Sequence, residues 1–427
     1  MSEKIKSDAA RRAGQELLGP LYWSFCAKLD VYQAAYASRD ASALYVARGG
    51  LRLREMYGVY LKKTGRQPMI PQHDLYLSRL AACKGCLARN FEPVAPILCR
   101  EFYGASLTEM IRAVMPALRE HSEPALVEAL PRELKGAKAD VASFAALYHA
   151  DAPLGREMRA MFEEQGALFE DYMAPLMAQE NLLVDTGWSG TAQLMLARHF
   201  KDRKWTGLYV GKWNTRGEHL PQFPYMSGLL VDQTTLRYGA QGGALFEYHH
   251  IVESPLELAI QSTEGYQRDE AGGAVPWPNV TEDPRLGQGD DAHWQGVMTY
   301  FDTVETDIPI DEVERRKERA LRRLSRKIRF PSRMDIESLL VPPRSADFGK
   351  TLRVPVMLEK DAAPFSQQIW RIRHALWRQG QIKREFPVLA PFICACYTAI
   401  RLSPRLARAV EQLILRYLAY AYQRRSR

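Results

Sequence analysis

The fold follows from one stretch of the sequence, Leu182-Leu183-Val184-Asp185-Thr186-Gly187-Trp188-Ser189-Gly190-Thr191-Ala192-Gln193. The apolar run at its start, from Asn181 to Val184, predicts a buried strand that ends at Asp185. The glycines that follow predict a tight turn, and we expect a helix from Thr191 to Phe200. A strand, a turn and a helix in succession are the repeating unit of an α/β protein.

The same succession recurs along the chain. Three further apolar segments with polar or glycine-rich ends predict strands: Ala43–Ala47, Asp74–Arg79 and Gly207–Val210. Because strands alternate with helices, we expect a Rossmann-like, mostly parallel sheet covered by helices on both faces. In such sheets the ligand binds at the carboxyl ends of the strands. Arg48, Arg79 and Asp185 all fall at these ends.

The domain organisation is expected to have four parts. They are an N-terminal helical segment (1–40), the Rossmann-like core with a helical insertion at about 105–180 (41–235), a second part of the site that includes a long loop at about 267–292 (236–310), and a basic, mainly helical C-terminal region (311–427).

Composition excludes several classes of protein. The chain has 427 residues, of which 46% are hydrophobic and 25% charged, so disorder, collagen and coiled-coil architectures are excluded. No apolar run reaches the roughly 18 residues that span a bilayer, and the N-terminus is too polar for a secretory signal. Six cysteines are too sparse for a disulfide scaffold. We therefore expect a cytoplasmic protein, or one peripheral at the inner face of the membrane.

Charge is distributed unevenly. Residues 311–427 carry 26 Lys and Arg against 11 Asp and Glu, a net charge of +15, whereas residues 1–310 carry 32 against 39, a net charge of −7. A basic region on an acidic body suggests a polyanionic neighbour, either a membrane surface or nucleic acid. The basic helix expected at Glu312–Arg329 could serve either one, but no recognised nucleic-acid module accompanies it, so we expect no specific nucleic-acid partner.

The end of the chain favours the membrane. Val388–Ile400 is apolar but too short to span a bilayer and contains a proline. A helix that opens at Ser403 has leucines, valine and isoleucine on one face and is flanked by arginines and tyrosines. This pattern is typical of a helix lying on an anionic membrane surface. The alternative is a terminal helix that docks on the body of the protein with a solvated basic face.

The turn after Asp185 could bind phosphate. Glycines let backbone N–H groups approach an anion, and the helix N-terminus adds partial positive charge. Asp185 could hold a sugar hydroxyl or a divalent metal such as Mg²⁺, although no cofactor is assigned. The donor-binding residues expected here are Gly187, Ser189, Gly190, Thr191 and Gln193. The alternative is an ordinary helix cap, since Ser and Thr are favoured there. It is not a Walker loop, because no lysine follows the second glycine.

Two arginines stand at equivalent positions. Arg48, next to Gly49, and Arg79 each follow an apolar strand, where a guanidinium can form a bidentate contact with phosphate. We assign Arg48, Gly49 and Arg79 to the donor site. The alternative for each arginine is a surface ion pair with a carboxylate.

The segment Tyr248–Glu253 contributes candidate acid/base groups. We predict His249 or Glu253 for this role, with Glu257 as a further carboxylate downstream. Adjacent histidines on a strand point to opposite sides, so His249 and His250 are not expected to share a metal, and no metal ligand is assigned. Cys83 and Cys86 lack a second ligand pair and are interpreted as ordinary helix residues.

Three segments together resemble a known family. In order they are Ala47-Arg48-Gly49-Gly50, Tyr76-Leu77-Ser78-Arg79 and Val184–Gln193. They are similar to the patterns Ala-Arg-Asp-Gly, Tyr-x-Ser-Arg and Val-Asp-x-Gly-Trp-x-Gly-Thr-x-Gln of a bacterial family from surface-polysaccharide gene clusters. Its members are often labelled haloacid-dehalogenase-like or glycosyltransferase-associated. The resemblance covers about residues 15–270.

One position departs from that family. Gly49 stands where the family has Asp, and a dehalogenase-like phosphatase needs a strand-end Asp as nucleophile. Phosphatase chemistry is therefore not expected. The resemblance still implies a glycosyltransferase-type enzyme of capsule, O-antigen or similar polysaccharide biosynthesis. It would use a nucleotide sugar or sugar phosphate and a lipid-linked glycan acceptor at the membrane face. The alternatives are a catalytically degenerate sugar-phosphate-binding or partner-binding module, and a phosphoribosyltransferase-like enzyme.

Overall fold

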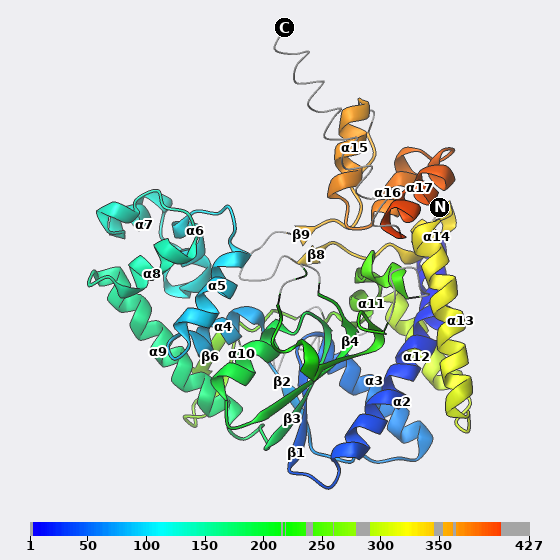
Figure 1. The fold of residues 1–427 in the computed structure, drawn as a ribbon, viewed down its shortest axis with the longest axis horizontal. Helices are drawn as coiled ribbons and strands as arrows, with labels where there is room; N and C mark the ends of the chain where they lie inside the picture. The colour runs from blue at the N-terminus through cyan, green and yellow to red at the C-terminus, as the bar shows by residue number, and fades with distance from the viewer. Residues whose placement is uncertain are drawn as a thin grey trace.

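A five-stranded parallel sheet forms the centre of the protein. The computed structural model describes residues 3–214, 217, 219–235, 242–258, 260–278, 291–345, 353–361 and 364–402. The strands are β1 (Ala41–Val46), β2 (Gln72–Leu75), β3 (Glu180–Trp188), β4 (Lys204–Lys212) and β5 (Met226–Asp232). Their order is β2-β1-β3-β4-β5 and every neighbouring pair is parallel (Figure 1). This confirms the expected Rossmann-like α/β fold, and the order changes direction between β1 and β3.

The strands are apolar throughout because the sheet is buried on both faces. Successive side chains alternate between the two faces. Tyr45 and Val184 belong to the core on one side, and Leu44 and Leu183 belong to the core on the other. All four side chains are essentially inaccessible to solvent. The sheet thus separates two hydrophobic cores, each of which a layer of helices covers.

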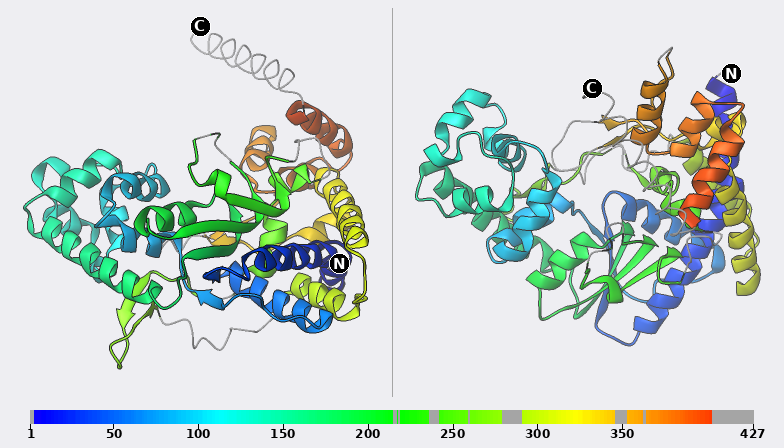
Figure 2. Two further views of the ribbon diagram at one scale, coloured as in Figure 1. Left: turned by 60° about the horizontal axis from the view of Figure 1, so that its bottom comes forward. Right: turned by 45° about the horizontal axis from the view of Figure 1, so that its top comes forward.

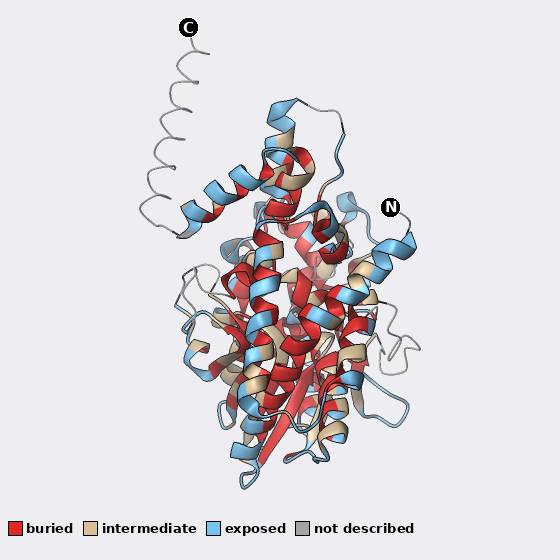
Figure 3. Cartoon of the chain, turned by 90° about the vertical axis from the view of Figure 1, so that its right-hand side faces the viewer, coloured by how far each residue is buried: buried red, intermediate tan, exposed pale blue. Residues whose placement is uncertain are grey.

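Helices from both ends of the described chain cover the first face. They are α1 (Glu3–Ala13), α2 (Gly19–Tyr36), α3 (Gly49–Thr64), α12 (Ala292–Thr303) and α13 (Ile310–Arg329). Figure 3 shows this side of the molecule, where the helices carry buried and exposed stretches in turn. The basic helix α13 buries Leu321, Leu324 and Ile328. On its other face Arg319 pairs with Glu312, so part of its charge is neutralised within the protein.

A large helical insertion between β2 and β3 packs on the second face, on the left in Figure 1. It comprises α4 (Arg79–Leu87), α5 (Phe91–Glu101), α6 (Leu107–Val114), α7 (Glu123–Ala129), α8 (Val141–His149) and α9 (Pro153–Met173). The helix α10 (Thr191–His199) joins this layer. The helices begin at residue 79, well before the boundary expected near residue 105. Cys83 and Cys86 are buried free thiols within α4.

Two strand boundaries differ from the sequence expectation. The strand expected at Asp74–Arg79 ends at Leu75, because Ser78 caps the next helix by accepting a hydrogen bond of 3.0 Å from the backbone N–H of Ala81. In the other direction, β3 continues past Asp185 to Trp188. Its pairing with β4 extends that far, so Asp185 lies near the end of the strand and not after it.

The expected long loop at 267–292 contains a hairpin. The strands β6 (Gly265–Arg268) and β7 (Ala274–Trp277) pair in antiparallel fashion beside α9 (Figure 2). The expectation of an irregular segment is wrong for this part, because the glycines at 272 and 273 form the hairpin turn. Residues 279–290 lie outside the described part of the chain.

The C-terminal region is helical as far as it is described. It contains α14 (Arg333–Leu339), a short pair β8 (Arg344–Ser345) and β9 (Arg353–Val354), and three helices α15 (Phe365–His374), α16 (Arg378–Glu385) and α17 (Ala390–Leu402). Arg371 and Glu385, both almost fully buried, form an ion pair of 2.7 Å that joins α15 to α16. The helix expected from Ser403 onwards lies outside the described residues. Among those described, no helix is long and apolar enough to cross a membrane.

Candidate functional site

A cavity of about 390 Å³ opens at the carboxyl ends of β1 and β3, where the strand order changes direction. Ligands of open α/β sheets bind at this point. Ten of the eleven residues expected in the site line the cavity: Arg48, Gly49, Arg79, Asp185, Gly187, Ser189, Gly190, Thr191, His249 and Glu253. Segments far apart in the sequence therefore meet in one place.

Gln193 is the exception. Its side chain is buried, and Nε2 donates to the backbone carbonyl groups of Trp205 (3.1 Å) and Tyr225 (3.0 Å). Its Oε1 accepts a hydrogen bond of 3.0 Å from the hydroxyl of Tyr209. These contacts join α10 to β4 and to the residue that precedes β5. The assignment of Gln193 to the donor site is corrected accordingly: its amide stabilises the fold beneath the site.

The surroundings of Asp185 shift the pKa of its carboxyl towards neutrality. The pKa of its carboxyl is raised from 3.8 to about 7, mainly by burial; hydrogen bonds from Thr186 lower the pKa and the nearby Glu253 raises it, and both effects are smaller than that of burial. The backbone N–H of Thr186 donates to Asp185 Oδ1 at 2.7 Å. Near neutral pH the carboxyl is therefore divided between its protonated and ionised forms. Carboxyl groups with such raised pKa values serve as acids or bases in enzymes.

The turn after Asp185 has the backbone expected of an anion-binding loop. Gly187 has φ of +114° and Gly190 has φ of +66°, which side-chain-bearing residues rarely adopt. Gly190 precedes the first turn of α10 and provides no side-chain cap for its N–H groups. Because Thr191 and Ala192 line the cavity, this helix N-terminus borders it. The backbone can therefore offer N–H groups and a positive dipole end to an anion.

The two arginines are paired with carboxylates, as the alternative interpretation expected, while they also line the cavity. Arg48 Nη2 lies 2.6 Å from Glu257 Oε1, and both side chains border the cavity. Arg79 Nη1 lies 3.2 Å from Glu101 Oε1 and is more exposed. A phosphate entering the cavity would compete with these carboxylates for the guanidinium groups.

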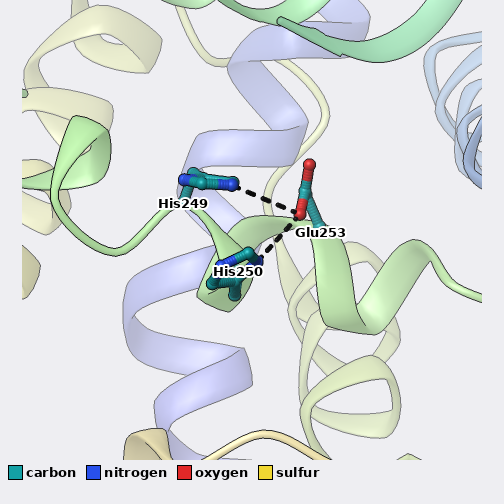
Figure 4. A group of neighbouring side chains, drawn as sticks. All are labelled: His249, His250 and Glu253. Carbon is teal, nitrogen blue, oxygen red and sulfur yellow. Dashed lines mark hydrogen bonds and ion pairs between the residues drawn. The ribbon is translucent and has the colours of Figure 1, made fainter. Parts of the chain in front are cut away.

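Glu253 receives contacts from three sides. Trp188 Nε1 donates to Oε1 at 2.8 Å, while His250 Nδ1 and His249 Nε2 lie 3.2 Å and 3.9 Å from Oε2 (Figure 4). The expectation that the histidines diverge on a strand is wrong. His250–Glu253 forms a short helix, α11, and His249 immediately precedes it, so both imidazoles approach one carboxylate.

Sequence reasoning missed three aromatic residues of the site, because Trp188, Tyr209 and Trp213 line the cavity. Trp188 and Trp213 contact the His249 ring, with ring centroids 5.2 Å and 6.1 Å apart. Trp188 lay within the decisive stretch but was not assigned a role. Trp213 directly follows β4, so its strand-end position was a signal that could have identified it.

Comparison of the sequence with models of known protein families gives no match, and comparison with curated proteins gives no significant match. The function must therefore be argued from the site.

Proposed function

We propose that this protein is a glycosyltransferase-type enzyme that binds a nucleotide sugar or sugar phosphate in the cavity between β1 and β3. The observation that carries the proposal is the convergence of two arginines, a helix N-terminus and a half-buried carboxyl at one switch point. Cationic side chains and backbone N–H groups are the usual partners of a diphosphate. The cavity volume is within the range of small-ligand sites.

The donor phosphates would be held by Arg48 and the N-terminus of α10, with Arg79 at the entrance. Binding would exchange the Arg48–Glu257 ion pair for an arginine–phosphate contact, which frees a carboxylate within the cavity. That carboxylate and Asp185 could then accept hydrogen bonds from sugar hydroxyls. Positioning and charge stabilisation supply most of the rate in reactions of this type.

Asp185 is the favoured acid/base group. Its pKa of about 7 lies near the operating pH, where proton transfer is most efficient. Glu253 accepts the indole hydrogen bond of Trp188 and lies within reach of two imidazoles, so its carboxylate is already engaged. We therefore place Glu253 and His249 beside the reacting centre and assign the proton transfer to Asp185.

Exposed apolar side chains in the C-terminal region support a location at the membrane face. They are Phe365 and Trp370 on α15, Val388 and Leu389 just before α17, and Phe392 in the first turn of α17. Val388 is 87% and Phe392 72% exposed. Apolar side chains beside basic ones favour an anionic lipid surface, where a lipid-linked glycan acceptor would be found.

A second candidate is a sugar-phosphate-binding module without turnover. Gly49 favours it, because the resembling family has Asp at this place and the neighbouring Thr186 leaves little room for a side chain here. The two candidates share the ligand and differ in catalysis.

Thermal unfolding of the full chain in the presence of nucleotide sugars, nucleoside diphosphates, phosphoribosyl pyrophosphate and sugar phosphates tests the proposal. Ligands that bind only the native state raise the unfolding midpoint. We expect one nucleotide family to do so, with the shift lost in Arg48→Ala and retained in Arg39→Ala, whose side chain pairs with Glu180 at the opposite end of the sheet. A shift of the unfolding midpoint by phosphoribosyl pyrophosphate alone would favour phosphoribosyl transfer. Binding of a ligand that the protein does not turn over would favour the binding module. No shift with any of these ligands would contradict the donor site.

A further inference from the structure

Three metal-ligating side chains converge at the edge of the cavity. One ligand atom from each of His249, His250 and Glu253 can be chosen so that all three lie within 4.8 Å of one another (Figure 4). His249 and Glu253 line the cavity, so the group borders the same space as Asp185. The three side chains are 26%, 14% and 13% exposed, which means that they are partly withdrawn from water.

The distances suit a small divalent metal. Zinc binds imidazole nitrogen and carboxylate oxygen at about 2.0–2.2 Å, so neighbouring ligand atoms of a tetrahedral site lie roughly 3.3–3.5 Å apart. The two nitrogen–oxygen separations here are 3.2 Å for His250 and 3.9 Å for His249. Both separations are within about 0.6 Å of this spacing, and all three ligand atoms lie within 4.8 Å of one another.

Local structure explains why the group forms. Glu253 follows His249 by four residues and His250 by three, so a single helical turn places it beside both imidazoles. The indole N–H of Trp188 holds Glu253 Oε1 at 2.8 Å and so directs Oε2 towards the imidazoles. Metal-ligating carboxylates characteristically have such an outer hydrogen-bond partner, which fixes their orientation.

We propose that His249, His250 and Glu253 form a divalent metal site of the zinc type, with an open coordination position that faces the cavity. Two imidazoles and one carboxylate are the ligand set of open, catalytic zinc sites, whereas Mg²⁺ and Ca²⁺ prefer oxygen ligands alone. The open position accepts water or an oxygen of a bound phosphate. Only that last assignment rests on the proposed function, because metal binding itself needs no donor.

Ion pairs without a metal would produce the same contacts, so metal binding has to be measured directly. The full chain is freed of metal by dialysis against a chelator, and Zn²⁺ binding is measured by calorimetry. A parallel titration with Co²⁺ is followed by visible absorption, which reports the coordination of the bound ion. Both experiments are done without any nucleotide or sugar.

The wild-type protein should bind one Zn²⁺, and the Co²⁺ complex should show the intense visible bands of a four- or five-coordinate site. We expect His250→Ala to weaken Zn²⁺ binding at least tenfold, because it removes one of the three proposed ligands. His250 is the suitable choice because it does not line the cavity, so its removal does not alter the proposed donor site directly. Glu253→Gln, which retains an acceptor for Trp188, should do the same. His374→Ala, on the exposed face of α15, is the matched control and should bind as the wild type does.

Equal Zn²⁺ affinity in the wild type and in folded His250→Ala and Glu253→Gln would overturn the proposal, as would stabilisation by Mg²⁺ alone. Circular dichroism of each variant establishes that it is folded. A donor-induced thermal shift in the presence of chelator, together with absent Zn²⁺ binding, would refute the metal site and leave the proposed donor site intact. Zn²⁺ binding without any donor-induced thermal shift would support the metal site and contradict the proposed donor site.

Discussion

A Cβ atom on Gly49 would lie 2.5 Å from Cγ2 of Thr186. Gly49 is the first residue of α3 and Thr186 follows Asp185, so the two residues face each other across the switch point between β1 and β3. No carbon atom fits at such a distance without a shift of its neighbour. The methyl group of Thr186 thus closes this position to a side chain.

This contact predicts a compensating pair of substitutions. Gly49→Ala should lower the free energy of unfolding by about 1–3 kcal/mol, because the new methyl group overlaps Cγ2 of Thr186. Thr186→Ser removes that methyl group, so the double variant should recover most of the loss. Urea denaturation of the four proteins in this cycle measures the coupling. In the control Gly58→Ala, where a Cβ meets nothing within 4 Å in an exposed helix position, stability should stay level or rise. Additive losses would contradict the contact.

The hydrogen bond between Trp188 and Glu253 gives a second prediction. Trp188→Phe keeps an aromatic ring but removes the donor to Oε1, which lies 2.8 Å away. Hydrogen bonds to charged groups contribute about 1.5–3 kcal/mol, and we expect a loss of stability in this range by urea denaturation. Trp205→Phe is the matched control, because its indole N–H reaches a neutral carbonyl at only 3.5 Å. A loss no larger than that of the control would show that the hydrogen bond contributes little.

The sheet could be predicted from the sequence because its signals are local. The segments around Val184 and Leu208 are continuous apolar runs, which is what burial on both faces requires. The end of β2 could not be placed in the same way. Ser78 and Arg79 follow apolar residues as a strand would continue, but the hydroxyl of Ser78 caps a helix there. Whether the strand continues or a helix begins at this point depends on the packing of the helical insertion, which is not a local signal.

Which residues line the cavity could be predicted to the extent that they stand at strand ends. Asp185 and Arg48 were identified in this way, and the parallel sheet brings them together. The geometry of His249 and His250 could not be predicted, since the alternation of a strand and a single turn of helix cannot be distinguished over so few residues. Gln193 was misassigned because a polar residue after a loop has the same sequence signal whether it points into a cavity or into the core.

The proposed membrane face gives a third prediction. Replacing both Leu389 and Phe392 with Glu should reduce binding to phosphatidylglycerol vesicles more than tenfold in a sedimentation assay. Each exposed apolar side chain contributes about 1.5–3 kcal/mol when it is buried, and the new charges oppose an anionic surface. Tyr103→Glu is the control, since Tyr103 is 94% exposed in the helical insertion and should leave vesicle binding unchanged. An equal loss of vesicle binding in the double variant and in Tyr103→Glu would contradict a specific lipid-facing surface. So would binding of the wild type to neutral vesicles as strong as its binding to phosphatidylglycerol vesicles.

The raised pKa of Asp185 predicts that this side chain makes stability depend on pH. Its carboxyl has a pKa of about 7 when folded and an ordinary value of 3.8, so the folded protein binds the proton more tightly than the unfolded chain does. The associated stability is complete below about pH 4 and is lost as the pH rises through 7. A rise of this size corresponds to about 4 kcal/mol, and partial access of water should reduce it to about 1–3 kcal/mol.

Asp185→Asn keeps the shape and the acceptor for Thr186 but cannot ionise, so it isolates this effect. We expect the variant to become progressively more stable than the wild type between pH 5 and about 8, as measured by urea denaturation at each pH. Other groups titrate alike in both proteins and cancel in the difference. Asp171→Asn, an exposed carboxylate paired with Arg268, should show no comparable rise. A pH-independent difference between Asp185→Asn and the wild type would mean that the Asp185 carboxyl is already ionised throughout this range, and its assignment as the acid/base group would then fail.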